Sequence, residues 1–179
     1  MKPAIGISMA AVWLFAATAL PAQQQPRGFA RPPAFPPDIV PPVLKVAGIG
    51  GKTVPFVEVT LAKLPQQTVK TSDHGTPVEY QGVLLSDVLA QVDRPVGDKF
   101  HKTAAAYYLV ADAADGYRAV FSWAELDPSI AEKTVYVVFK RDGKDLAESE
   151  GPFALVVPGE KRNARWVRQL QSLRILLAQ

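Results

Sequence analysis

The sequence predicts an α+β domain that is rich in β-strands and carries only a few short helices. Short runs of β-branched and aromatic residues recur from residue 43 to the C-terminus. Glycine-containing turn signals separate these runs at regular intervals. Only one or two segments have apolar residues at helical spacing, and these segments are short. Many short strands with few helices are typical of a β-dominated α+β fold.

The first 22 residues have the pattern of a secretory signal peptide. Lys2 provides a short basic start, residues 5–20 form an apolar run, and the small residues Ala19 and Ala22 offer cleavage sites. The alternative is an uncleaved membrane anchor. Because the apolar run falls short of the roughly 20 residues of a spanning helix, export and release are favoured. We therefore expect a periplasmic or secreted protein without a membrane span after cleavage.

Residues 23–42 are predicted to be an extended, poorly ordered tether. Proline recurs in "QQQPRGFARPPAFPPDIVPP", and each proline removes an N–H donor and restricts the residue before it. A Pro-rich ligand for a partner protein is the functional alternative. The folded domain is then expected to comprise residues 43–179.

The domain begins with two strand-like segments and a helical turn. Residues 43–50 and 54–59 are rich in valine and are separated by a glycine turn. Thr60 is placed to cap a short helical turn over residues 60–64, which ends before Pro65.

The next segments predict a strand, a turn-rich piece and a helix. Residues 67–72 alternate between polar and apolar, as a half-buried strand does. Residues 74–82 carry turn signals on both sides of a short extended piece. Residues 84–92 have apolar side chains at helical spacing, and Asp87 near their start favours the helix dipole.

The second half of the domain also consists of short strand-like segments separated by turns. Residues 105–123 form two strand-like runs about the Asp115-Gly116 turn, which is a strong hairpin signal. Ser122 is placed to cap the helical turn that follows. The remaining strand-like segments are residues 134–146, 153–158 and 170–178.

A basic segment follows the strand-like residues 153–158. Its charges can form an ordinary solvated turn or a receptor for an anion, because backbone amides and charge-assisted donors together suit a phosphate or another oxyanion. His74 lies on a turn-rich segment, where we expect a structural or ligand-contact role. The candidate binding residues are His74, Gly159, Lys161, Arg162, Arg165 and Arg168.

Composition argues against several classes of function. The net charge is +3 and no lysine- and arginine-rich run with interleaved aromatics occurs, so we expect no nucleic-acid partner. The chain contains no cysteine, which excludes a disulfide, a thiol nucleophile and a cysteine-ligated metal. One histidine beside one aspartate does not make a metal site, so no metal ligand is predicted and no catalytic residue can be named.

The order of these segments resembles the oxidoreductase molybdopterin-binding domain of the sulfite oxidase family. The resemblance covers roughly residues 43–179. It implies a compact α+β fold that holds molybdopterin and acts on sulfite, sulfoxides or related small oxyanions. The matching residues are Gly82, Val83, Leu85, Leu89, Asp115, Gly116, Tyr117, Asp142, Gly143, Leu146, Gly151, Pro152, Pro158, Gly159, Arg165, Trp166 and Val167.

The chain departs from the family pattern at two positions that concern the cofactor. The family's metal-ligating cysteine lies upstream of Gly82, in a segment that contains no cysteine here. Ala154 stands where the family often has an arginine, which would offer a forked donor to an anion. The expectation is therefore a domain that binds a pterin or a related anionic molecule, without molybdenum ligated by cysteine and without conventional molybdenum catalysis.

Two alternatives remain open at this point. One is a non-catalytic periplasmic binding or accessory module that kept the fold and lost the cofactor. The other is a domain that docks a partner through the Pro-rich tether. Under either reading the macromolecular partner that we expect is a periplasmic redox or accessory protein.

Overall fold

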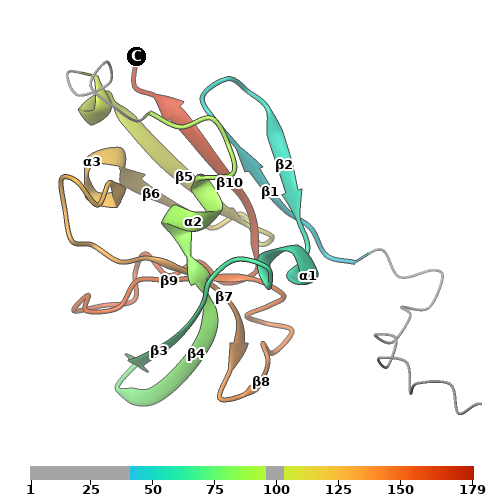
Figure 1. Ribbon diagram of the computed structural model, residues 1–179. Helices are drawn as coiled ribbons and strands as arrows, with labels where there is room; N and C mark the ends of the chain where they lie inside the picture. Colours follow the sequence, from blue (N-terminus) through green and yellow to red (C-terminus); the bar gives the residue numbers. More distant parts are fainter. Residues whose placement is uncertain (1–40, 96–102) are drawn as a thin grey trace, which may run out of the picture. The chain divides into compact units, whose positions relative to one another are not determined.

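The computed structural model of the chain describes residues 41–95 and 103–179. The predicted signal peptide and nearly all of the Pro-rich tether lie outside the described residues. None of the helices in the described part is long and apolar enough to span a membrane. The described residues form two five-stranded sheets with a few short helices, which confirms the prediction of a β-rich α+β fold (Figure 1).

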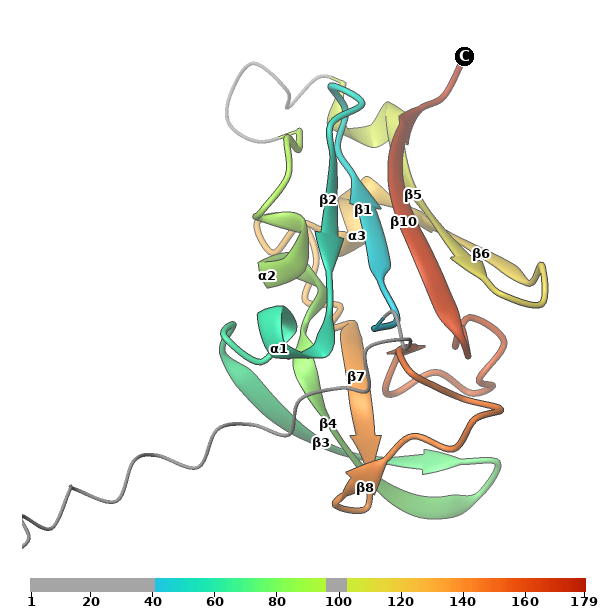
Figure 2. The same cartoon turned by 90° about the vertical axis from the view of Figure 1, so that its right-hand side faces the viewer.

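The first sheet unites the two ends of the described domain. Its central pair, β1 and β10, is parallel, and its other neighbours are antiparallel. The C-terminal strand thus lies beside the first strand of the domain (Figure 2). In spatial order the strands are β2 (Thr53–Phe56), β1 (Leu44–Ala47), β10 (Leu170–Leu177), β5 (Tyr107–Ala113) and β6 (Arg118–Ser122).

The second sheet is antiparallel throughout and lies below the first in Figures 1 and 2. Its β3–β4 hairpin turns at His74 and Gly75, whose φ angles are 49° and 88°. Positive φ at both central residues is the geometry of a type I′ turn. The strands in order are β3 (Gln66–Asp73), β4 (Thr76–Leu84), β7 (Tyr136–Arg141) and β8 (Lys144–Asp145), with β9 (Ala154–Val156) also pairing with β7.

The short helices agree with the predicted positions in part. Ser122 lies at the N-cap position of α3, as predicted, and its backbone N–H donates to the Glu125 carboxylate at 2.9 Å, which is one half of a capping box. Thr60, however, lies inside α1 rather than before it, because its hydroxyl bonds back to Val57. That helix therefore begins earlier than predicted. The helices are α1 (Glu58–Leu61), α2 (Leu85–Leu89), α3 (Trp123–Leu126) and the 3₁₀ turn η2 (Ala104–Ala106).

Two hydrophobic clusters hold the domain together. The larger cluster joins the inner face of the first sheet to helices α1, α2 and α3, with Phe121, Trp123 and Leu173 among its buried members. The smaller cluster lies on the second sheet and includes Tyr80 and Ala154. Ala154, at the position of the family's arginine, is 6% exposed and belongs to this core. It therefore serves packing and offers nothing to a ligand.

Candidate functional site

The candidate site lies where the tip of the β3–β4 hairpin meets residues 158–168, which we call the basic loop. The basic loop connects β9 to β10 and contains Gly159, whose φ of 77° is a conformation that favours glycine. Tyr117 of the β5–β6 turn donates its hydroxyl to the Ala164 carbonyl. This hydrogen bond fixes the basic loop against the first sheet.

A partly buried ion-pair network lies behind the hairpin tip. Asp73 is 6% exposed and accepts hydrogen bonds from Arg141 Nη1 at 3.1 Å and from Asn163 Nδ2 at 2.9 Å. Arg141 Nη1 also contacts Glu150 Oε1 at 2.7 Å. Arg168 Nη2 lies 3.5 Å from Asp73 and 3.8 Å from Glu150. Two arginines thus face two carboxylates, so the network is neutral.

Aromatic rings complete the surroundings of Arg141. Its guanidinium lies 5.6 Å from the centre of the Tyr80 ring, and Trp166 packs edge-on against the same ring. Burial raises the pKa of Tyr80 to about 12, against the opposing effect of Arg141. Burial lowers the pKa of Arg141, but Tyr80, Glu150 and Asp73 outweigh that effect and raise it. The arginine and the phenol therefore keep their protons at neutral pH.

Arg165 belongs to a second network, away from the hairpin tip. Its Nε donates to Glu160 at 3.0 Å and its Nη1 to Glu125 at 2.9 Å. Lys133 Nζ approaches the same two carboxylates, at 2.8 Å and 3.4 Å. The guanidinium also lies 4.8 Å from the centre of the Phe121 ring. Arg165 therefore anchors the basic loop to β6 and α3.

Two polar cavities open at the hairpin tip, and His74 lines both. The larger cavity has a volume of about 720 Å³ and the smaller cavity about 210 Å³. The larger cavity is lined by Ser72, His74, Gly75, Glu160, Lys161, Arg162, Asn163 and Ala164. The smaller cavity is lined by Asp73, His74, Asp115, Tyr117, Asn163, Trp166 and Arg168.

The structure thus brings some of the predicted binding residues together and separates others. His74, Lys161 and Arg162 line the larger cavity, and Arg168 joins His74 at the smaller one. Lys161 and Arg162 are exposed and form no ion pair with any other described residue. Arg165 points into the second network instead. The assignment of the six residues to one binding site remains a prediction.

Several residues of this region carry no signal in the sequence. Glu150 is 9% exposed and paired with Arg141, although acids in loops are usually solvated. Asp73 meets Arg168 across a separation of 95 residues in the chain. Only the adjacency of Asp73 to His74 could have drawn attention to it. Contacts that depend on how distant strands are paired cannot be inferred from local patterns.

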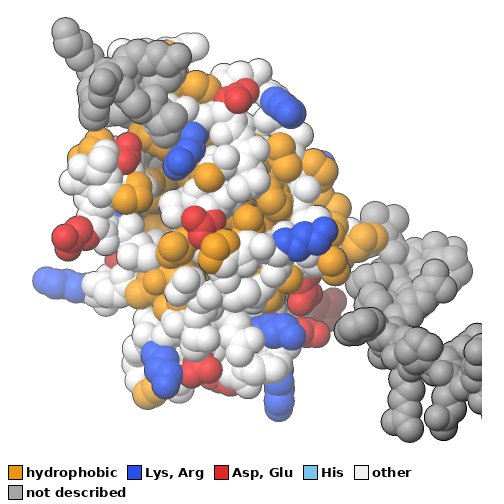
Figure 3. Space-filling view, in the orientation of Figure 1, with side chains coloured by type: hydrophobic (Ala, Val, Ile, Leu, Met, Phe, Trp, Pro, Cys, Tyr) orange, Lys and Arg blue, Asp and Glu red, His pale blue; other side chains and the backbone are white. Residues whose placement is uncertain are grey.

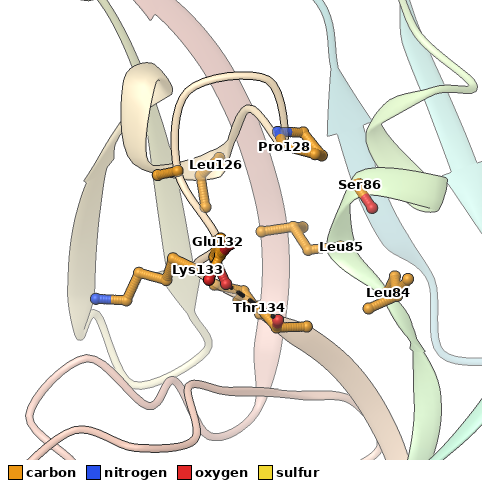
Figure 4. A pocket seen from close by; sticks show the side chains of 10 residues that line it. Leu84, Leu85, Ser86, Leu126, Pro128, Glu132, Lys133 and Thr134 are labelled. Carbon is orange, nitrogen blue, oxygen red and sulfur yellow. Dashed lines mark hydrogen bonds between the residues drawn. The ribbon is translucent and has the colours of Figure 1, made fainter.

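A third cavity of about 300 Å³ lies between the start of α2 and the segment after α3 (Figure 4). Leu85, Leu126 and Pro128 are among its mainly apolar lining, and Lys133 points away from it. Hydrophobic side chains also gather over the middle of this face in Figure 3. None of the predicted binding residues lies here. This cavity is therefore separate from the candidate site.

No group of three or more histidine or acidic residues that could hold a metal ion occurs within residues 41–95 and 103–179. Asp73 and His74 are neighbours, with His74 Nε2 3.7 Å from Asp73 Oδ1. The Asp73 oxygens are already bonded to Asn163 and Arg141. The Asp73 carboxylate is therefore engaged by donors of the protein itself.

The chain matches no protein-family profile and no curated protein in sequence. Among solved structures it is similar to the sulfane dehydrogenase SoxCD from Paracoccus pantotrophus, with a TM-score of 0.55 and 22% sequence identity. The alignment covers 75% of this chain and 38% of the SoxCD chain. The chain thus corresponds to less than half the length of that protein. At this identity the likeness shows a related fold.

Proposed function

We propose that this domain binds an anionic small molecule in the larger cavity, and that it does so without thiolate-ligated molybdenum catalysis. The ligand that the sequence resemblance favours is a pterin that carries a phosphate. The likeness to SoxCD supports the fold on which such a site would be built. The signal-peptide pattern supports a place for this binding outside the cytoplasm, in the periplasm or beyond.

The observation that carries the proposal is a pair of cations at the rim, Lys161 and Arg162, which form no ion pair with any other residue that the structure describes. The network of Asp73, Glu150, Arg141 and Arg168 is neutral, and Glu160 is occupied by the second network. Lys161 and Arg162 consequently leave the larger cavity positive. Asp115 lines the smaller cavity, and its negative charge opposes the binding of an anion there. An anion is therefore expected to bind in the larger cavity. Charge-assisted hydrogen bonds from two such donors suit a phosphate or a similar oxyanion.

The residues fit the anionic part of a pterin cofactor and do not fit its metal. The chain has no cysteine, and the segment that carries the family's thiolate corresponds here to the β3–β4 hairpin. A carboxylate at that place, Asp73, is buried and held by an amide and two guanidinium groups. Its Oδ1 accepts a hydrogen bond from Asn163, and its Oδ2 accepts one from Arg141. No redox step follows from these side chains.

The ion-pair network behind the hairpin tip favours a non-catalytic binding or accessory module over an oxidoreductase. Ionic side chains fill the space behind the hairpin tip, whereas a metal centre would need room and a soft ligand there. The cavities that remain are at the rim and are lined by polar donors. We therefore propose that the domain binds a ligand and carries out no metal chemistry.

The direct test is the content of the protein purified from the cell envelope of its own host. Pterin is measured by fluorescence after oxidation, and molybdenum by mass spectrometry. We expect pterin near stoichiometry, or, if it is absent, binding of inorganic phosphate by calorimetry. The double variant Lys161→Ala with Arg162→Ala should weaken either by roughly tenfold or more, since each charged hydrogen bond contributes about 1.5–3 kcal/mol.

A matched control removes two exposed lysines elsewhere, Lys52→Ala with Lys63→Ala, and changes net charge by the same amount. This control should bind like the unchanged protein. Absence of pterin together with no heat of phosphate binding would overturn the proposal. Stoichiometric molybdenum would overturn its non-catalytic part.

A further inference from the structure

The edge strands of the two sheets differ in how well they are protected against pairing. An edge strand presents unpaired N–H and C=O groups, and proteins usually shorten such strands or place proline in them. Here β2 has four residues and contains Pro55, β6 has five residues, and β8 has two. In contrast, β3 has eight residues and no proline. No strand in the described part of the chain pairs with its outer side (Figure 1).

The backbone groups that β3 presents to solvent follow from its hairpin. Asp73 and Thr76 flank the two-residue turn and form the first hydrogen-bonded pair, and hydrogen-bonded and non-hydrogen-bonded pairs then alternate. Ser72 therefore faces Pro77 in a non-hydrogen-bonded pair, which is consistent because proline has no N–H. Further along, Glu79 directs its own N–H and C=O to Asp142, on the side away from β3.

The outward-facing positions of β3 are thus every second residue. Their side chains are all exposed, so neither main chain nor side chain is covered by the described domain. Lys70 is the one charged residue among them, and its Nζ lies 3.7 Å from Glu79 of the neighbouring strand. The outward-facing residues are Gln66, Thr68, Lys70 and Ser72.

We propose that β3 pairs in antiparallel fashion with β3 of a second copy of this chain, in a register centred on Val69. In a two-fold pairing, outward-facing residues must oppose one another. A register centred on Lys70 would place two lysines face to face, which is unfavourable. The register centred on Val69 overlaps residues 66–72 and places Lys70 opposite Thr68 of the second copy. It is the longest pairing of the strand that opposes no like charges.

The other pairs of this register are also compatible. Gln66 opposes Ser72 of the second copy, and Gln67 opposes Thr71. Val69 meets its own counterpart on the inner face, next to the smaller hydrophobic cluster that already contains it. The second sheets of the two copies become one continuous sheet through β3. The absence of proline and of opposed charges over the overlap is what makes a second copy the fitting partner.

The same geometry sets the strength of this association. Seven paired residues span roughly 24 Å at about 3.4 Å per residue. A single strand pair of this length buries far less than the roughly 1,200 Å² of a stable interface. The dimer is therefore weak and depends on concentration. Because Ser72 also lines the larger cavity, each copy reaches the rim of its partner's cavity, and the two cavities lie at opposite ends of the paired strands.

Analytical ultracentrifugation of the purified protein over a range of concentrations tests the proposal. We expect a reversible monomer–dimer equilibrium. The variant Thr68→Pro removes an outward-facing N–H from each copy, which an edge strand tolerates. Its dissociation constant should rise by roughly tenfold, since two backbone hydrogen bonds are lost per dimer. The control Thr68→Ala keeps the N–H and should dimerise within about twofold of the unchanged protein.

Two charge variants test the register and do not depend on the proline variant folding. Thr68→Glu places a carboxylate opposite each Lys70, and Thr68→Lys places an ammonium there. The first should tighten and the second weaken the dimer, each by roughly 2- to 30-fold, because two cross-strand pairs change per dimer. Circular dichroism confirms that each variant is folded. A protein that stays monomeric up to its solubility limit, or charge variants with equal dissociation constants, would overturn the proposal.

Discussion

Replacing Arg141 by alanine tests whether the buried network holds the second sheet together. Arg141 is the residue that joins Asp73 to Glu150, at 3.1 Å and 2.7 Å. Removing it leaves two nearly buried carboxylates with only the longer contacts from Arg168, at 3.5 Å and 3.8 Å. Truncating one member of a buried ion pair is much more destabilising than the pair itself is stabilising, because the remaining charge stays desolvated.

The magnitude follows from what remains after the change. Loss of one partner of a fully buried pair costs about 3–5 kcal/mol. The Arg141 side chain is 28% exposed, so water can reach part of the vacated space. Asp73 also keeps its hydrogen bond from Asn163 and its contact with Arg168. We therefore expect the free energy of unfolding to fall by about 2–3 kcal/mol, below the fully buried range.

The assay is urea unfolding followed by tryptophan fluorescence, to which Trp166 near the network contributes. With a slope of about 2 kcal/mol per molar urea, the midpoint should fall by about 1–1.5 M. Arg118→Ala serves as the control, because Arg118 pairs with Asp112 but its side chain is 60% exposed. Such exposed pairs contribute at most about 1 kcal/mol.

A rescue variant distinguishes the stability lost through incompletely paired carboxylates from the stability lost through poorer packing. Adding Asp73→Asn and Glu150→Gln to Arg141→Ala removes both stranded charges and should recover at least half of the lost stability. The reasoning is refuted if Arg141→Ala costs no more than Arg118→Ala, or if neutralising the two carboxylates recovers nothing.

Two further predictions concern acid stability and a close approach of strands. Burial raises the pKa of Glu160, but hydrogen bonds from Arg165 and Lys133 outweigh it and lower the pKa below its ordinary value of 4.5. The group therefore stabilises the fold above that value, and the stability is lost as pH falls through the folded pKa. Glu160→Gln should lower the melting temperature at neutral pH and flatten its decline in acid, and an unchanged acid slope would contradict this. Gly82→Ala should cost at least about 3 kcal/mol in urea unfolding, since the new Cβ would lie 2.2 Å from the Val137 carbonyl oxygen; a cost within 1 kcal/mol would contradict it.

The strands of this domain were predictable because their signals are local. Alternation of apolar residues located β3, and the Asp115-Gly116 turn located the hairpin of β5 and β6. The start of α1 was wrong because Thr60 bonds backward to Val57 from within the helix. A hydroxyl can cap from either position, and the sequence does not distinguish them.

The partners of the basic residues were not predictable in the same way. The four basic residues of this loop look alike in the sequence, since all lie within the ten residues that follow the strand-like segment 153–158. They are Lys161, Arg162, Arg165 and Arg168. Their environments differ because the fold brings Glu125 and Glu160 to Arg165, whereas Lys161 forms no ion pair with any other described residue. A count of positive charges therefore overestimates the charge that a ligand would meet.

The residues that carry the family resemblance are explained by the fold itself. Gly116 and Gly143 occupy turns at φ of 86° and 76°, and Gly82 and Gly151 allow close approaches that a Cβ would block. These requirements come from the backbone geometry of this chain and do not depend on a cofactor. In the family pattern that the sequence resembles, two residues contact the cofactor or an anion: a cysteine, which is missing here, and an arginine, in whose place Ala154 lies buried in the core. The resemblance therefore supports the architecture, and a proposal about ligands has to rest on the unpaired cations of the basic loop.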